Sequence, residues 1–212
     1  MTGYFAVTID VEPDCSPTWH YSNPLTFEGV RVGLGEVLQP LFARFEVRPT
    51  YLINNVVLDH EPSVRMLAGL DACELGAHLH PEFIGPQCRY DDPAGRKAEA
   101  NQCFLPVGLE LAKMSALTDR FVACFGRRPA SFRAGRFSAG PNTIRCLKEL
   151  GYRVDTSVTP HISWADPTRE QAVDYRRCPE QPYLVGEQSL AHPDPAGNIL
   201  EVPVSVASRR RL

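Results

Sequence analysis

The sequence predicts an α/β protein in which parallel strands alternate with helices. Three observations predict this class. Short apolar segments alternate with segments of helical length, the connections between successive strands are long enough for crossover helices, and a composition of 43% hydrophobic and 22% charged residues is globular. The 212 residues suit one domain, so we expect a single domain over residues 1–212.

The first expected strand covers residues 4–11, where Phe5, Val7, Ile9 and Val11 alternate onto one face. The later segments are short, apolar and bounded by Pro, Gly or polar residues. The expected strands that follow are residues 49–54, 73–80, 130–134, 152–158 and 199–206.

The expected helices are residues 28–45, 62–70, 107–125 and 141–150. The third is the clearest, because Pro106 precedes it and Gly126 follows it, as helix starts and ends prefer. Two long stretches between these elements, residues 14–27 and 159–198, have no regular pattern. Both follow strands, and in a parallel barrel such loops lie at the carboxyl face, where functional sites are built.

The six expected strands fit either an open sheet or a barrel. A closed barrel usually has about seven or eight strands, so a barrel would be incomplete at its C-terminal end.

The net charge of −3 gives no reason to expect a nucleic-acid partner. No apolar stretch is long enough to cross a membrane, and the start has no signal-peptide pattern, so we expect a cytoplasmic protein. The seven cysteines never form C-x-x-C, and we expect mostly small buried side chains rather than a cysteine zinc site.

Two acids lie at the end of the first expected strand. Residues i and i+2 of a strand share a face, so Asp10 and Glu12 point away from the face that carries Val11. Two solvated acids at a strand end would give the same pattern.

Two histidines follow the same rule in ELGAHLHPEF. On a strand His78 and His80 point the same way, whereas on a helix they would diverge. Pro81 ends the strand, which leaves both imidazoles at its carboxyl end. Two imidazoles with one carboxylate are a common ligand set of catalytic zinc. A pair of exposed loop histidines is the alternative.

Arg133 ends another short expected strand, in ASFRAGRFSAG. A guanidinium there can hold a carboxylate through two hydrogen bonds, although a surface arginine is the alternative. Gly135 and Gly140 indicate a close approach of the backbone or unusual dihedral angles. The acid pair, the histidine pair and Arg133 all fall at carboxyl ends of expected parallel strands, which favours one joint site.

With these motifs the sequence resembles the polysaccharide deacetylase family, also called the NodB-homology or carbohydrate esterase 4 family. The resemblance rests on TIDVEP, ELGAHLHPE, SFRAGRFSAG, GYRVDTSVTP and ILEVPVSV, which occur in the family's order. It implies an irregular (β/α) barrel of the polysaccharide deacetylase type, lacking the last family strands. It also implies a metal-dependent hydrolase that removes acetyl groups from N-acetylated sugars.

The resemblance implies roles by position. Asp10 matches the catalytic base and Arg133 the arginine that pairs with it. His78 and His80 match the metal-binding histidines, and Arg136 matches a position whose backbone N–H helps hold the oxyanion.

Three departures from the family pattern accompany these matches. The family's first motif has two adjacent aspartates, whereas here Val11 follows Asp10. A branch of the family has this spacing, so Glu12 is the expected metal ligand and Asp10 is the alternative. The histidines are separated by one residue, which is closer than the family's usual spacing. The family's final leucine-x-histidine motif supplies the general acid and has no match after residues 199–206, which leaves His161 and His192 as candidates.

We therefore expect a divalent metal, zinc above all, and a carbohydrate or small-amide substrate. A bound ion would activate water and Asp10 would take its proton. An amidohydrolase acting on small linear or cyclic amides is one alternative. A catalytically degenerate glycan-binding homologue and an α/β domain with coincidental histidines are the others. The sequence does not predict an oligomeric state.

Overall fold

The computed structural model describes residues 5–17, 20–88, 101–165, 173–187 and 189–206. Its contacts divide the chain into two compact units. Unit 1 consists of residues 1–78 and 119–129, and unit 2 of residues 79–118 and 130–212. The single domain over residues 1–212 stays a prediction.

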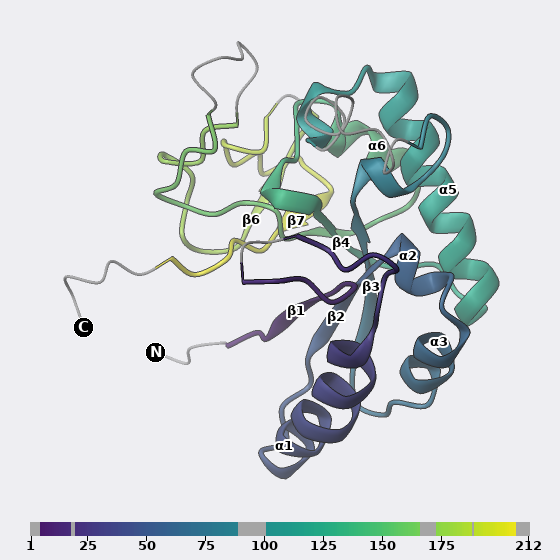
Figure 1. Cartoon of the computed structure of the whole chain (residues 1–212). Helices are drawn as coiled ribbons and strands as arrows, with labels where there is room; N and C mark the ends of the chain where they lie inside the picture. Colours follow the sequence, from purple (N-terminus) through teal and green to yellow (C-terminus); the bar gives the residue numbers. More distant parts are fainter. Residues whose placement is uncertain (1–4, 18–19, 89–100, 166–172, 188, 207–212) are drawn as a thin grey trace. The chain divides into compact units, whose positions relative to one another are not determined.

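Unit 1 carries parallel strands in the order β1 (Thr8–Val11), β2 (Thr50–Asn54) and β3 (Glu74–Leu79), which lie side by side in Figure 1. The central strand β2 buries Tyr51, Leu52 and Ile53 completely. Strands with neighbours on both sides and helices over the faces are apolar throughout, which explains the unbroken apolar run in β2.

The helical elements of unit 1 are η1 (Gly29–Leu38), α1 (Gln39–Arg44), α2 (Asn55–Leu58) and α3 (Glu61–Ala68). The expected helix 28–45 is thus a π-helix that continues into an α-helix. Its start is held by Asp14, whose carboxylate accepts hydrogen bonds from the backbone N–H groups of Glu28 at 2.8 Å and Gly29 at 2.7 Å. These are donors that a helix start leaves without an intrahelical partner.

Unit 2 carries strands in the order β4 (Ser131–Ala134), β5 (Val154–Asp155), β7 (Ile199–Glu201) and β6 (Tyr183–Val185). β4, β5 and β7 are parallel, and β6 pairs antiparallel with β7. Its helical elements are η2 (Pro81–Phe83), η3 (Gln102–Phe104), η4 (Gly135–Phe137) and α6 (Thr143–Glu149). Helix α5 (Val107–Phe125) begins in unit 2 and ends in unit 1.

The predicted α/β class with parallel strands is confirmed. One prediction is wrong in part, because β6 lies inside residues 159–198, a stretch expected to be irregular. The first strand is shorter than residues 4–11 and begins at Thr8, and residue 4 lies outside the described residues. Phe5 precedes the strand and is 90% exposed, so it does not belong to the buried face that its alternation with Val7 predicted.

The cysteines also differ from expectation. Only Cys146 and Cys178 are buried, whereas Cys15 and Cys88 are exposed and the other three are intermediate. Among the described residues, no helix combines the length and the apolar character that a membrane crossing requires.

Candidate metal centre

The strand register of unit 1 brings the acid pair level with His78. Val11 pairs with Ile53, so Glu12 follows at the level of Asn54, and Asn54 pairs with His78 on its other side. Glu12 Oε1 lies 2.7 Å from His78 Nε2, and Asp10 Oδ2 lies 4.0 Å from the same nitrogen. Both carboxylates therefore face one imidazole nitrogen, as the shared face of residues i and i+2 requires.

The loop after β1 supplies a further contact to this group. An isolated bridge between Cys15 and Tyr21 folds the loop back, and the Tyr21 hydroxyl donates a hydrogen bond to Glu12 Oε2 at 2.8 Å. The two Glu12 oxygens thus have different partners, Tyr21 and His78. Sequence reasoning missed Tyr21, because no local pattern in residues 14–27 indicates that the loop returns to its own strand.

His80 follows His78 by two residues. One ligand atom from each of Glu12, His78 and His80 lies within 4.8 Å of the others. His78 and His80 are buried, and the Glu12 side chain is 19% exposed. Two imidazoles and a carboxylate this close together form a metal-site-like group that could hold a divalent ion.

The other side of His80 faces an ion pair within unit 2. Arg136 donates to Glu82 Oε1 at 2.6 Å, and His80 Nδ1 lies 3.4 Å from this oxygen and 3.3 Å from Arg136 Nη1. Burial alone would raise the pKa of Glu82, but the hydrogen bonds and charges of His80 and Arg136 lower it to about 2. Glu82 is therefore an ionised carboxylate although it is buried.

Glu82 was missed by sequence reasoning, although the signal was present. It stands two residues after His80 in HLHPE, the same spacing that joins the two histidines. Pro81 predicted the end of the strand, and β3 does end at Leu79. The short helix η2 then brings the Glu82 side chain back to His80, so that Glu82 Oε1 contacts His80 Nδ1.

A buried lysine holds the segment that carries Glu82. Lys113 is 0% exposed, and its ammonium donates to the backbone carbonyls of Pro81 at 2.9 Å, Ile84 at 2.7 Å and Gln87 at 3.2 Å. Lys113 lies on the buried face of α5, four residues before Leu117. A charged residue within an apolar helical stripe is a sequence signal for a buried, fully bonded cation.

The expected close approach of backbone at Gly135 and Gly140 is confirmed. A Cβ at Gly135 would lie 2.6 Å from the Leu79 carbonyl oxygen and 2.9 Å from His80 Nε2. A Cβ at Gly140 would lie 2.7 Å from Cys103 Cα. Only glycine permits this contact between η4 and the His80 ring.

Arg136 has a left-handed backbone with φ 53° and ψ 24°. An L-residue adopts this conformation at a cost of about 1 kcal/mol or more, and the ion pair with Glu82 helps offset it. The predicted role of its backbone N–H stays a prediction. The structure adds a contact that the sequence did not suggest, from its side chain to the Glu82–His80 pair.

Arg133 is buried at the end of β4. Its guanidinium donates to the Thr156 carbonyl oxygen at 2.9 Å and to Thr156 Oγ1 at 3.0 Å, and it lies 5.6 Å from the centre of the Phe137 ring. These contacts fix its orientation inside unit 2, so the surface-arginine alternative is wrong. Its pairing with Asp10 stays a prediction.

The two candidate general acids are exposed histidines, each in contact with a polar side chain of unit 2. His161 Nε2 lies 2.8 Å from Glu180 Oε1, and its backbone has a φ of 69°. His192 Nδ1 lies 3.1 Å from Ser189 Oγ. Either role as proton donor stays a prediction.

A second group of buried acids lies on β5 and β7. Asp155 and Glu201 are paired in register and are both fully buried. Burial raises the pKa of Asp155, and burial together with the Asp155 charge raises that of Glu201 well above its usual value. Among the described residues, none forms a hydrogen bond with Glu201 Oε2. A proton shared with Asp155 would give this oxygen a hydrogen bond.

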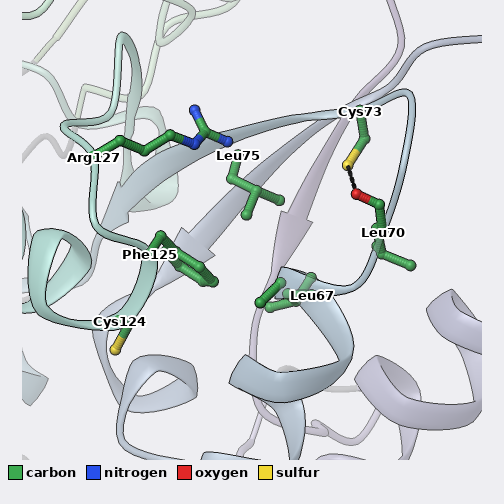
Figure 2. A pocket seen from close by; sticks show the side chains of 8 residues that line it. Leu67, Leu70, Cys73, Leu75, Cys124, Phe125 and Arg127 are labelled. Atoms are coloured by element: carbon green, nitrogen blue, oxygen red, sulfur yellow. Dashed lines mark hydrogen bonds between the residues drawn. The ribbon is translucent and has the colours of Figure 1, made fainter.

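Unit 1 also contains a pocket of about 200 Å³ that is separate from the candidate metal ligands (Figure 2). Leucines and Phe125 form much of its lining, and Cys73 donates to the Leu70 carbonyl oxygen at 3.9 Å. None of its lining residues is a candidate ligand or base. We assign no chemistry to it.

The comparisons with known proteins agree with this architecture at the level of the fold. No protein-family model matches the sequence, and no curated protein matches it. Solved structures do match, and they include polysaccharide deacetylases. The chain therefore has the α/β fold of polysaccharide deacetylase structures.

Three of these structures illustrate the match. A protein from Mycobacterium smegmatis, provisionally assigned as a polysaccharide deacetylase, has a TM-score of 0.56 at 17% identity over 94% of this chain and 58% of its own. A provisionally assigned glycoside hydrolase/deacetylase from Parabacteroides distasonis has a TM-score of 0.57 at 12% identity, over 93% and 44%. Puue allantoinase has a TM-score of 0.51 at 18% identity, over 84% and 45%. This chain thus spans about half the length of the structures it matches.

Proposed function

We propose that the protein is a zinc-dependent hydrolase that removes acetyl groups from N-acetylated sugars. The observation that carries the proposal is the convergence of Glu12, His78 and His80, whose ligand atoms lie within 4.8 Å of one another. The fold that the chain shares with the Mycobacterium smegmatis protein supports the substrate class.

The donor set fits a divalent ion of the zinc type. His78 offers Nε2 from a buried position, and Tyr21 fixes Glu12 through Oε2, so that Oε1 is turned toward the histidine. Nitrogen and oxygen donors of this kind are the usual ligands of zinc in hydrolases. A bound ion of this type supplies Lewis-acid polarisation of water and of the scissile carbonyl.

The protein's own residues would move the protons. The Asp10 side chain is 30% exposed, so it is accessible to water, and its carboxylate would accept the proton of the attacking water as general base. The backbone N–H of Arg136 would donate to the developing oxyanion. The leaving amine needs a proton, for which His161 and His192 are the candidates.

Metal binding and turnover are tested separately. Calorimetry should detect about one zinc ion per chain, and His78→Ala should abolish this binding because it removes a ligand. His192→Ala is the matched control, since it removes an exposed histidine that is not a proposed ligand. If His78→Ala bound zinc as well as the unchanged protein, the proposed site would be wrong.

Acetate release from N-acetylglucosamine oligomers tests the reaction. We expect zinc-dependent release that a chelator stops and that added zinc restores. Asp10→Asn should keep zinc binding and lose at least about 100-fold in rate, because general base catalysis contributes on the order of 10²–10⁴-fold.

The second candidate function is hydrolysis of small linear or cyclic amides. The shared fold with an allantoinase motivates it, so allantoin belongs in the same assay panel. Turnover of small amides without acetate release from sugars would favour this candidate. Saturable binding of the oligomers with zinc present but without turnover would instead favour a catalytically degenerate glycan-binding protein.

A further inference from the structure

His80 Nδ1 faces two groups that require opposite hydrogen-bonding roles of it, acceptor for one and donor for the other. Arg136 Nη1 lies 3.3 Å away and Glu82 Oε1 lies 3.4 Å away. These two partners are joined by a much shorter contact of 2.6 Å. His80 and Glu82 are both buried, so water competes little for these contacts.

A histidine that binds a metal ion must be a neutral imidazole, which carries a single proton on one of its two nitrogens. A guanidinium can only donate and a carboxylate paired with it can only accept, so Nδ1 can satisfy one of them at a time. Bonding to Arg136 requires an unprotonated Nδ1 and places the proton on Nε2. Bonding to Glu82 requires Nδ1–H and leaves the lone pair on Nε2.

The ring orientation decides which nitrogen serves a metal ion. The edge of His80 that carries Cδ2 and Nε2 packs against Gly135, whose Cβ, if present, would lie 2.8 Å and 2.9 Å from these two atoms. Nδ1 is therefore kept on the side of the ion pair. Nε2 is the ring atom that would coordinate, and it can do so only while its proton is absent.

We propose that Glu82 is a positioning residue that selects the Nδ1–H tautomer of His80, against the competing contact from Arg136, and so makes Nε2 a metal ligand. The inference rests on the proposed function only for the identity of the group that Nε2 binds. The three carbonyl contacts of Lys113 hold the segment around Glu82 in the position that this selection needs.

The tautomer is measured directly by long-range ¹H–¹⁵N spectra of the metal-free full chain labelled with ¹⁵N-histidine. The His80 signals are those that disappear in His80→Gln. We expect Nδ1–H in the unchanged protein. Glu82→Gln should shift the signals toward Nε2–H, because an amide oxygen is a weaker acceptor than a carboxylate, and should lower zinc affinity about 10–100-fold.

Two further variants sharpen the test. Arg136→Met removes the competing donor, so it should retain Nδ1–H and change zinc affinity by less than about 3-fold. Glu110→Gln is the matched control, because it makes the same substitution at a buried glutamate whose partners are Gln102 and Thr143. It should leave both the tautomer and the affinity unchanged.

The outcomes separate this inference from the proposed function. If Glu82→Gln leaves the His80 tautomer unchanged, or if Arg136→Met shifts it to Nε2–H, the inference is overturned whether or not zinc binds. If the unchanged protein shows Nδ1–H but binds no zinc, the proposed metal site fails while the tautomer assignment stands. Circular dichroism of each variant establishes that it is folded, and Arg136→Met still decides the question if Glu82→Gln is not.

Discussion

Glu82 and the Asp155–Glu201 pair are buried acids of the same unit with opposite properties. Burial raises the pKa values of Asp155 and Glu201, although the charge of Arg133 acts on Asp155 in the opposite direction. Burial acts on Glu82 in the same direction, yet His80 and Arg136 lower its pKa to about 2. The comparison teaches that direct hydrogen bonds to Arg136 and His80 keep a buried carboxyl charged, whereas pairing with a second buried carboxyl favours retention of a proton even under the influence of Arg133.

The largest effect is expected from breaking the pair. Asp155→Ala removes the acceptor of Ser157 Oγ at 2.8 Å and of the Ser157 N–H at 3.3 Å, and it leaves Glu201 without its partner. We expect the free energy of unfolding to fall by about 4 kcal/mol, measured by urea denaturation. Asp155→Asn keeps the shape and an acceptor, so it should cost only about 1 kcal/mol. Equal losses in the two variants would contradict the assignment.

The pH dependence of stability should reveal the proton of the pair. The unfolded chain loses it near the ordinary values of 3.8 and 4.5, whereas the folded chain retains it to higher pH. The pair therefore contributes its full stability below about pH 4 and loses it as the pH rises, by at most about 1.4 kcal/mol per pH unit.

Between pH 5 and pH 7 the loss is at most about 2.7 kcal/mol for one proton, measured as the difference between the unchanged protein and Glu201→Gln. The variant carries no titrating proton at position 201, so its stability should change less over this range. Parallel pH profiles of the two proteins would show that the pair is already ionised at pH 5.

The same Glu→Gln substitution at two buried glutamates tests whether a charged partner makes the carboxylate important for stability. Glu82→Gln should cost about 2 kcal/mol, because it removes the charge that pairs with Arg136. Glu110 has neutral partners, Gln102 and Thr143, and burial raises its pKa, so Glu110→Gln should cost under about 1 kcal/mol. Thermal and urea unfolding of the two variants compare these costs, and a larger loss for Glu110→Gln would reverse the interpretation.

The smallest effect concerns the hydroxyl that supports the pair. Ser157 Oγ donates to Asp155 and accepts from the Ala134 N–H at 2.9 Å, so Ser157→Ala should cost about 1 kcal/mol. In the Asp155→Ala background the same substitution should cost less, because one of its two contacts is already absent. Additive losses in the double variant would show that Ser157 does not act through Asp155.

Much of the fold was predictable from local patterns. The sequence predicts β2, β3 and α5 because the pattern of each depends only on residues within that one element. β2 and β3 are apolar runs, and α5 is bounded by Pro106 and Gly126. The period-two rule also placed Asp10, Glu12 and His78 on one side, and their roles remain predictions. β6 was missed because its three residues carry no long pattern and because 13 residues, 186–198, separate it from its partner β7.

Contacts that join distant segments could not be predicted in this way. The contact of Tyr21 with Glu12 depends on how a loop returns, and the Arg136–Glu82 pair joins residues 54 positions apart. Glu82 follows His80 by two residues, the same spacing that predicted the pairing of His78 with His80. It was overlooked because Pro81 correctly predicts the end of a strand but does not predict the direction of the next side chain.

Lys113 orders the backbone next to the candidate metal centre without being a metal ligand. Its ammonium already gathers three carbonyl oxygens of the segment that follows His80, so this segment is ordered by a cation that belongs to the chain. An incoming metal ion would not have to organise that backbone, and little of its binding free energy would be lost to conformational entropy. Affinity at this centre would then depend on the ligands themselves, and the ion could exchange without unfolding its surroundings.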